Sequence, residues 1–126
     1  MPPRWTLRAA ACLAAIVLAS CAAPTAATRT PRPNEVQVLE PAGKPESWSF
    51  APSEVPVPKG ATVTFVNRGK EFHTITADDV GRPFDLSLEA GHTGTITFAN
   101  VGTFAYHCGV HPQMKGVVRV CDGACP

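Results

Sequence analysis

Residues 102–116 read Gly-Thr-Phe-Ala-Tyr-His-Cys-Gly-Val-His-Pro-Gln-Met-Lys-Gly, and this stretch decides how the rest of the chain is interpreted. In its first half Phe104, Tyr106 and Cys108 occupy alternate positions, as in a β-strand with one buried face. Two of the three are large aromatic residues of the kind that fill a core. The pattern therefore turns Cys108 toward the interior and His107 toward solvent.

Four residues in and near this stretch carry chemistry that favours copper: His73, Cys108, His111 and Met114. One thiolate, two imidazoles and a weak axial thioether form the ligand set of a trigonal copper site. His73 shares a strand face with Ile75, so the alternation presents it to the same interior as Cys108. Such a site transfers single electrons and leaves no open position for a substrate. We therefore assign no catalytic residue and expect a protein that is not an enzyme.

The remainder of the folded part shows the same period-two alternation, with turn residues between the strands. The alternating pairs are Val36 and Val38, Val63 and Phe65, Ile96 and Phe98, and Val118 and Val120. No window sustains a helical period, and prolines interrupt most stretches that could form a helix. The sequence predicts an all-β fold, an antiparallel Greek-key β-sandwich of about seven or eight strands, over residues 35–126.

The first 20 residues do not resemble part of that fold. Two arginines precede a short apolar run over residues 9–19, which is too short for a membrane span and is typical of a signal peptide. The run ends in Leu-Ala-Ser-Cys21, which resembles a bacterial lipobox. This resemblance implies that residues 1–20 are a lipoprotein signal peptide cleaved before a lipidated Cys21. The alternative is an ordinary secretory signal cut near Ala22 or Ala27, which would give a periplasmic or secreted protein.

Residues 21–34 are rich in Pro, Ala and Thr and predict an extended tether between a membrane and the domain. After removal of residues 1–20 the chain has nine basic and ten acidic side chains, a formal net charge of −1. Binding to nucleic acid, which requires a basic surface, is therefore not expected. We expect a monomer attached to the bacterial cell membrane through its lipid.

Cys121 and Cys125 lie at the C-terminus with three residues between them. In an oxidising compartment two neighbouring thiols form a disulfide, which is the pairing that we predict. A flexible dithiol that collects Cu(I) is the alternative.

At this point the chain resembles the cupredoxins, the small blue copper proteins, and most of all amicyanin and plastocyanin. The resemblance covers about residues 48–120 and includes Phe72-His73-Thr74 and the motif from Gly102 to Gly116. The gap of two residues between His111 and Met114 is most similar to amicyanin. The resemblance implies one type 1 copper per chain, bound by His73, Cys108, His111 and Met114. In many relatives an asparagine follows the first histidine and braces the ligand loop, whereas this chain has Thr74.

The same residues are compatible with other roles. Structural zinc would use the cysteine and histidines but not the methionine, and Met114 alone would be an ordinary core residue. His92 is expected to be an exposed turn residue. A histidine beside the cysteine binds a second copper in copper nitrite reductases, but only His92 and His107 remain here to supply such a site. We therefore expect His107 to be a solvent-facing strand residue.

The predicted function is a type 1 copper electron-transfer protein that shuttles single electrons between extracytoplasmic redox partners. Donor and acceptor would dock transiently at the edge of His111, among Val110, Pro112 and Phe72. The alternative is a protein for copper sequestration or delivery, aided by Cys121 and Cys125. A third alternative, an enzyme subunit with a second metal at His107, would require two coppers per chain.

Overall fold

The computed structural model describes residues 30–126. The predicted signal peptide, the lipid-attachment residue Cys21 and most of the predicted tether lie outside the described residues, so these remain predictions. Within residues 30–126 no helix is long and apolar enough to cross a membrane.

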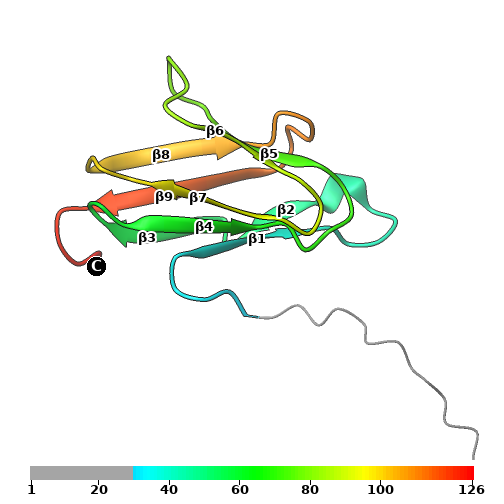
Figure 1. Ribbon diagram of the computed structural model, residues 1–126, viewed down its shortest axis with the longest axis horizontal. Helices are drawn as coiled ribbons and strands as arrows, with labels where there is room; N and C mark the ends of the chain where they lie inside the picture. The colour runs from blue at the N-terminus through cyan, green and yellow to red at the C-terminus, as the bar shows by residue number, and fades with distance from the viewer. Residues whose placement is uncertain (1–29) are drawn as a thin grey trace, which may run out of the picture.

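Two sheets form a β-sandwich (Figure 1). One sheet has the strand order β2-β1-β4-β7 and the other β3-β9-β8-β5-β6. The strands are β1 (Glu35–Leu39), β2 (Ser49–Ala51), β3 (Glu54–Pro58), β4 (Thr62–Val66), β5 (His73–Ala77), β6 (Asp85–Leu88), β7 (Thr93–Thr97), β8 (Gly102–His107) and β9 (Lys115–Cys121). A short 3-10 helix, η1 (Pro45–Ser47), lies between β1 and β2. The predicted all-β sandwich is confirmed.

The strand pairing differs from the prediction in two respects. Strand β1 pairs in parallel with β4, and β3 in parallel with β9, so both sheets are mixed rather than purely antiparallel. Residues 30–126 also contain nine strands rather than seven or eight, because β2 and β3 belong to different sheets although only Pro52 and Ser53 separate them. Hydrophobic alternation predicts that a segment is a strand, but not which partner it pairs with.

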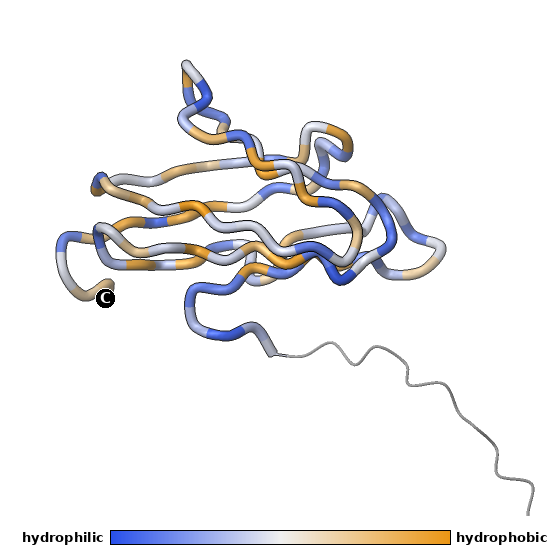
Figure 2. Tube along the Cα trace, viewed as in Figure 1, coloured by the Kyte–Doolittle hydropathy of each residue, from blue (hydrophilic) through white to orange (hydrophobic). Residues whose placement is uncertain are grey.

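The core lies between the sheets and is made by the alternating residues that the sequence predicted. Along the strands hydrophobic positions alternate with hydrophilic ones (Figure 2). The phenol ring of Tyr106 packs on Phe50 and Phe65, with ring centroids 5.1 and 5.6 Å away. A Cβ atom at Gly116 would lie 2.3 Å from that phenol, so only glycine fits opposite Tyr106. Burial raises the pKa of Tyr106 well above its usual value, so its hydroxyl stays protonated.

Strands β8 and β9 run between the two ends of the sandwich (Figure 1). At one end the loop of residues 108–114 joins β8 to β9. At the other end β9 runs into the C-terminal tail, where Cys121 and Cys125 form a disulfide with an S–S distance of 2.07 Å. The Lys59 N–H donates to the carbonyl of Cys121 at 2.9 Å, which holds the start of the tail against the end of β3.

Candidate metal centre

Three elements place the candidate ligands at one end of the sandwich. His73 is the first residue of β5, and Cys108 follows the last residue of β8. Met114 directly precedes β9, so the loop of residues 108–114 carries the candidate ligands Cys108, His111 and Met114. Within the loop the Cys108 N–H donates to the carbonyl of Met114 at 3.0 Å, and the Met114 N–H donates to the carbonyl of His111 at 2.9 Å. These two backbone hydrogen bonds close the loop into a compact turn.

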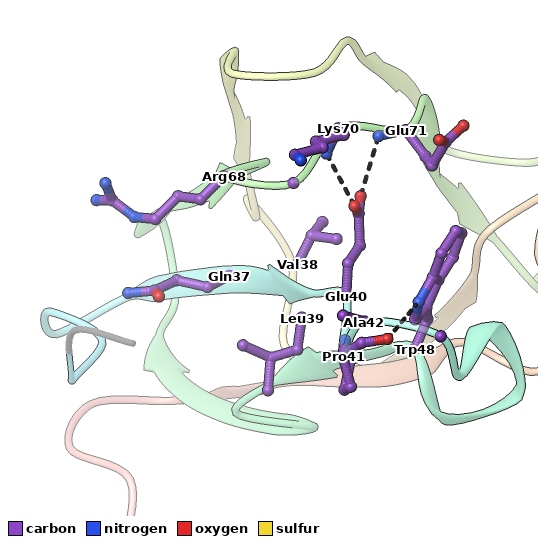
Figure 3. Close-up of a pocket in the computed structure, with 12 residues that line it drawn as sticks. Gln37, Val38, Leu39, Glu40, Pro41, Ala42, Trp48, Arg68, Lys70 and Glu71 are labelled. Carbon is purple, nitrogen blue, oxygen red and sulfur yellow. Dashed lines mark hydrogen bonds between the residues drawn. The ribbon is translucent and has the colours of Figure 1, made fainter. Parts of the chain in front are cut away.

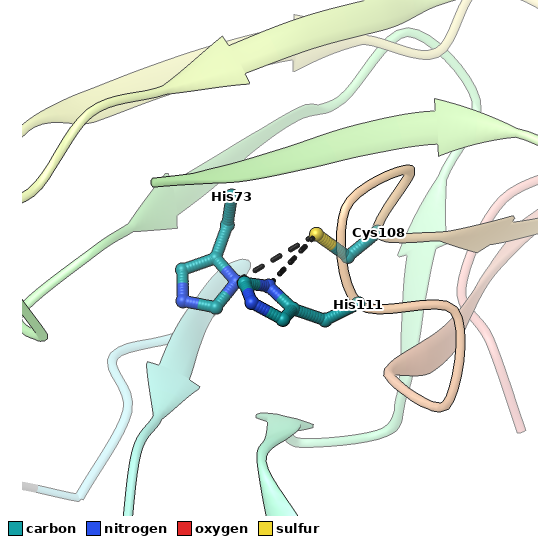
Figure 4. Close-up of side chains that lie close together, drawn as sticks. All are labelled: His73, Cys108 and His111. Atoms are coloured by element: carbon teal, nitrogen blue, oxygen red, sulfur yellow. Dashed lines mark hydrogen bonds between the residues drawn. The ribbon is translucent and has the colours of Figure 1, made fainter. Parts of the chain in front are cut away.

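The side chains of His73, Cys108 and His111 converge on one point (Figure 4). The Cys108 Sγ lies 3.6 Å from His73 Nδ1 and 3.8 Å from His111 Nδ1, and the two nitrogens are 3.3 Å apart. A triangle with these sides has a circumscribed radius of about 2.1 Å. First-row metal ions such as zinc have bond lengths of roughly 2.0–2.1 Å to imidazole and roughly 2.3 Å to thiolate. One ion at the centre of the triangle therefore fits all three donors.

Burial distinguishes the members of this group. His73, Cys108 and Met114 are fully buried, with 0% of each residue exposed, whereas His111 is half-buried. The backbone hydrogen bonds of Met114 hold it in the same turn as Cys108 and His111. A thiolate and two imidazoles converge here, with a buried methionine in the same turn, and these residue types are the donor set of a type 1 copper site.

Thr74 braces the site from the neighbouring position on β5. Its backbone N–H donates to the Cys108 sulfur at 3.3 Å. Its hydroxyl oxygen accepts the Gly109 N–H at 2.7 Å, which ties the ligand loop to β5. Thr74 thus holds the ligand loop through its hydroxyl.

The hydroxyl of Thr74 belongs to a chain of hydrogen bonds that ends at the carboxylate of Asp85, and this carboxylate sets the direction of the chain. Thr76 donates its hydroxyl proton to Asp85 Oδ1 at 2.9 Å. Thr76 must therefore accept from Thr74, whose hydroxyl lies 2.8 Å away. This leaves the oxygen of Thr74 free to accept from Gly109. Each hydroxyl along β5 acts once as donor and once as acceptor.

Glu40, just beyond β1, contacts the outer nitrogen of His73. Its Oε1 lies 2.8 Å from His73 Nε2. Its carboxylate also accepts the backbone N–H of Lys70 at 2.8 Å and of Glu71 at 3.2 Å. Partial burial alone would raise the pKa of Glu40, but the hydrogen bonds from Lys70, His73 and Glu71 outweigh it and lower this pKa below its usual value. Glu40 therefore faces His73 as a carboxylate.

Trp48 covers the two candidate ligand histidines from outside. Its ring meets His111 edge-on at a centroid distance of 4.9 Å and His73 at 5.8 Å. The indole N–H donates to the carbonyl of Pro41 at 3.3 Å, which fixes the ring. Neither Trp48 nor Glu40 was predicted from the sequence as part of the site. Both lie in or beside the segment that joins β1 to β2, whose spacing bears no relation to the ligand motif.

The remaining histidines lie apart from the three converging donors. His107 points away from the core, and its Nδ1 contacts the carboxylate of Asp78. His92 is exposed and follows a turn. Within residues 30–126 the three donors of His73, Cys108 and His111 form the only cluster of histidine, cysteine or acidic groups arranged to hold a metal ion.

The fold and the site together define a small β-sandwich protein with a thiolate–imidazole metal centre of the type 1 copper kind. Comparison with known families agrees: residues 9–120 match the model of the cupredoxin-like domain, and the chain belongs to this family. The donor set and the family support one type 1 copper ion per chain as the cofactor.

Several known proteins are similar to this chain in sequence or in structure. Plastocyanin of Scenedesmus fuscus is 32% identical over 83 residues, which cover 56% of this chain and 85% of plastocyanin. A purple cupredoxin from Nitrosopumilus maritimus matches with a TM-score of 0.60 and 27% identity, covering 69% of this chain and 98% of the other. A reduced Cu(I) form of an amicyanin variant matches with a TM-score of 0.58 and 27% identity, covering 69% and 80%.

Proposed function

We propose that the protein is a single-electron carrier in which His73, Cys108, His111 and Met114 bind one type 1 copper ion. The observation that carries this proposal is the triangle of Sγ and two Nδ1 atoms, whose centre suits one ion at about 2.1 Å from each donor. When bound, copper supplies a Cu(II)/Cu(I) couple. The ligand residues are all supplied by the chain, which suits a carrier rather than an enzyme with an open coordination position.

The surroundings of the donors suit rapid electron transfer because they resist rearrangement. Cys108 and His73 are fully buried: the Thr74 N–H donates to the Cys108 sulfur, and the carboxylate of Glu40 accepts from His73 Nε2. The backbone turn of residues 108–114 fixes the other donors. Ligands that cannot move adopt the same compromise geometry in both oxidation states, which keeps reorganisation small.

The proposed port for electrons is the exposed side of His111. Val110 and Phe72 lie beside the ligand histidines in sequence and have 52% and 36% of their surfaces exposed, and Pro112 is also exposed. A small apolar contact of this kind suits brief docking of redox partners, in which quick release matters more than tight binding. Only the imidazole ring of His111 would then separate a partner protein from the metal.

The leader sequence supports an extracytoplasmic location, with Cys21 as the lipid anchor and residues 21–34 as the tether. Fractionation of cells tests the lipid anchor, because a lipidated protein is recovered with the membranes and a merely secreted one is not.

The alternative role in copper delivery has less support, because Cys121 and Cys125 form a disulfide and cannot act as a copper-collecting dithiol.

The direct test is the absorption and electron paramagnetic resonance spectra of the copper-loaded protein, combined with metal counting. We expect one copper per chain, intense blue colour and the narrow hyperfine splitting of a thiolate-bound centre. Cys108→Ser should abolish the blue band, because its charge transfer originates at the sulfur. A colourless wild-type protein, or blue colour that survives in Cys108→Ser, would overturn the proposal.

A further inference from the structure

Glu40 holds the ligand His73 from the side opposite the metal site. The two residues are 33 positions apart in the chain, and their side chains are 10% and 0% exposed. Glu40 Oε1 lies 2.8 Å from His73 Nε2, while His73 Nδ1 faces the Cys108 sulfur at 3.6 Å. Because an ionised carboxylate can only accept, Nε2 carries the proton. In the neutral ring Nδ1 is then left with its lone pair directed at the metal position.

The carboxylate is fixed within the loop of residues 67–72. The backbone N–H groups of Lys70 and Glu71 both point at Glu40, as Figure 3 shows. Gly69 allows the loop to come this close, since a Cβ atom there would lie 2.0 Å from Glu40 Oε1. The buried side chain of Asn67 holds the same loop, donating to the carbonyls of Glu71 and Leu88 at 2.7 and 3.0 Å.

We propose that Glu40 is a positioning residue for the copper centre: it fixes the tautomer of His73 and lowers the reduction potential of the bound metal. This inference rests on the proposed function. A carboxylate bonded to the outer nitrogen makes the imidazole a stronger donor, and loss of such a partner typically costs about 10–100-fold in metal affinity. A negative charge one imidazole away also favours the ion with the higher positive charge. Both effects favour Cu(II) over Cu(I).

The test is the reduction potential of Glu40→Gln, a substitution that preserves shape and removes the charge. We expect the preference for Cu(II) over Cu(I) to fall about tenfold, which corresponds to a rise in potential of about 59 mV for one electron. The matched control is Glu71→Gln, which removes an equal charge from an exposed side chain of the same loop. If Glu40→Gln shifts the potential no more than Glu71→Gln does, the proposal is wrong.

A second measurement does not require copper. In the metal-free protein, nitrogen NMR of the histidine rings should show His73 protonated at Nε2, with a slowly exchanging proton. Glu40→Asp, which keeps the charge but shortens the side chain, should speed this exchange at least about tenfold because the 2.8 Å hydrogen bond is lost. Unchanged exchange, or a proton found on Nδ1, would refute the positioning role. A wild-type protein that forms no blue centre would instead refute the proposed function.

Discussion

The two proposed ligand histidines, His73 and His111, lie 3.3 Å apart at their Nδ1 atoms, yet their environments are opposite. His73 is fully buried, begins a strand and has its outer nitrogen bound by Glu40. His111 is half-buried, lies in a loop and is bordered by the exposed Val110. His73 therefore anchors the site within the sheet, whereas His111 connects it to the surface.

The difference between the two histidines is tested most strongly by removing each imidazole ring in turn. His111→Gly and His73→Gly should both lose the blue colour, because each lacks one donor. Added imidazole should restore the colour of His111→Gly, since its site opens to the surface. In His73→Gly the space is buried behind Glu40, so we expect rescue to require at least about tenfold more imidazole, a difference of ~1.4 kcal/mol. Titration of the blue band with imidazole measures this difference.

Equal rescue of the two variants would show that the two histidines are equally accessible. Circular dichroism spectra of both variants provide the control for folding.

Electron exchange at the exposed histidine is tested by a charge placed beside His111. Val110→Lys should slow electron self-exchange about tenfold, equivalent to ~1.4 kcal/mol, because two copies must bring their lysines together. The matched control is Val101→Lys, since Val101 has the same 52% exposure but precedes β8 at the other end of the sandwich. Nuclear magnetic resonance line broadening in mixtures of oxidised and reduced protein measures the rate. Equal slowing by both lysines would place the port elsewhere.

The least pronounced effect concerns the hydroxyl of Thr74, beside the buried His73. Thr74→Val keeps the shape of the side chain but removes the acceptor of the Gly109 N–H and the donor to Thr76. We expect the free energy of unfolding of the metal-free protein to fall by about 1 kcal/mol. Denaturant titration measures this change, with Thr74→Ser as the variant that keeps the hydroxyl. A Thr74→Val protein as stable as Thr74→Ser would show that the hydroxyl chain contributes nothing.

Local sequence patterns were enough to predict where the proposed ligands lie. The spacing of Cys108, His111 and Met114 requires only one short turn, and alternation along β5 and β8 orients His73 and Cys108 toward one interior. These relations involve neighbouring residues, so they are visible in the chain itself.

The supporting residues depend on tertiary packing and could not be predicted in this way. Glu40 reaches His73 only because the end of β1 packs under the loop of residues 67–72. The parallel pairing of β1 with β4 likewise depends on how the chain crosses between sheets. A glutamate directly after a strand of alternating polar and apolar residues gives no sign of its eventual partner. Only the sheet arrangement brings these distant segments together.

The disulfide at the far end of the sandwich has a consequence for assembly of the copper centre. Of the cysteines within residues 30–126, Cys108 alone keeps a free thiol, and it is buried. Oxidants that cross-link exposed thiols would find none on this part of the folded chain. The disulfide thus removes two competing thiols, and an arriving soft metal ion meets a single free thiol on this part of the chain.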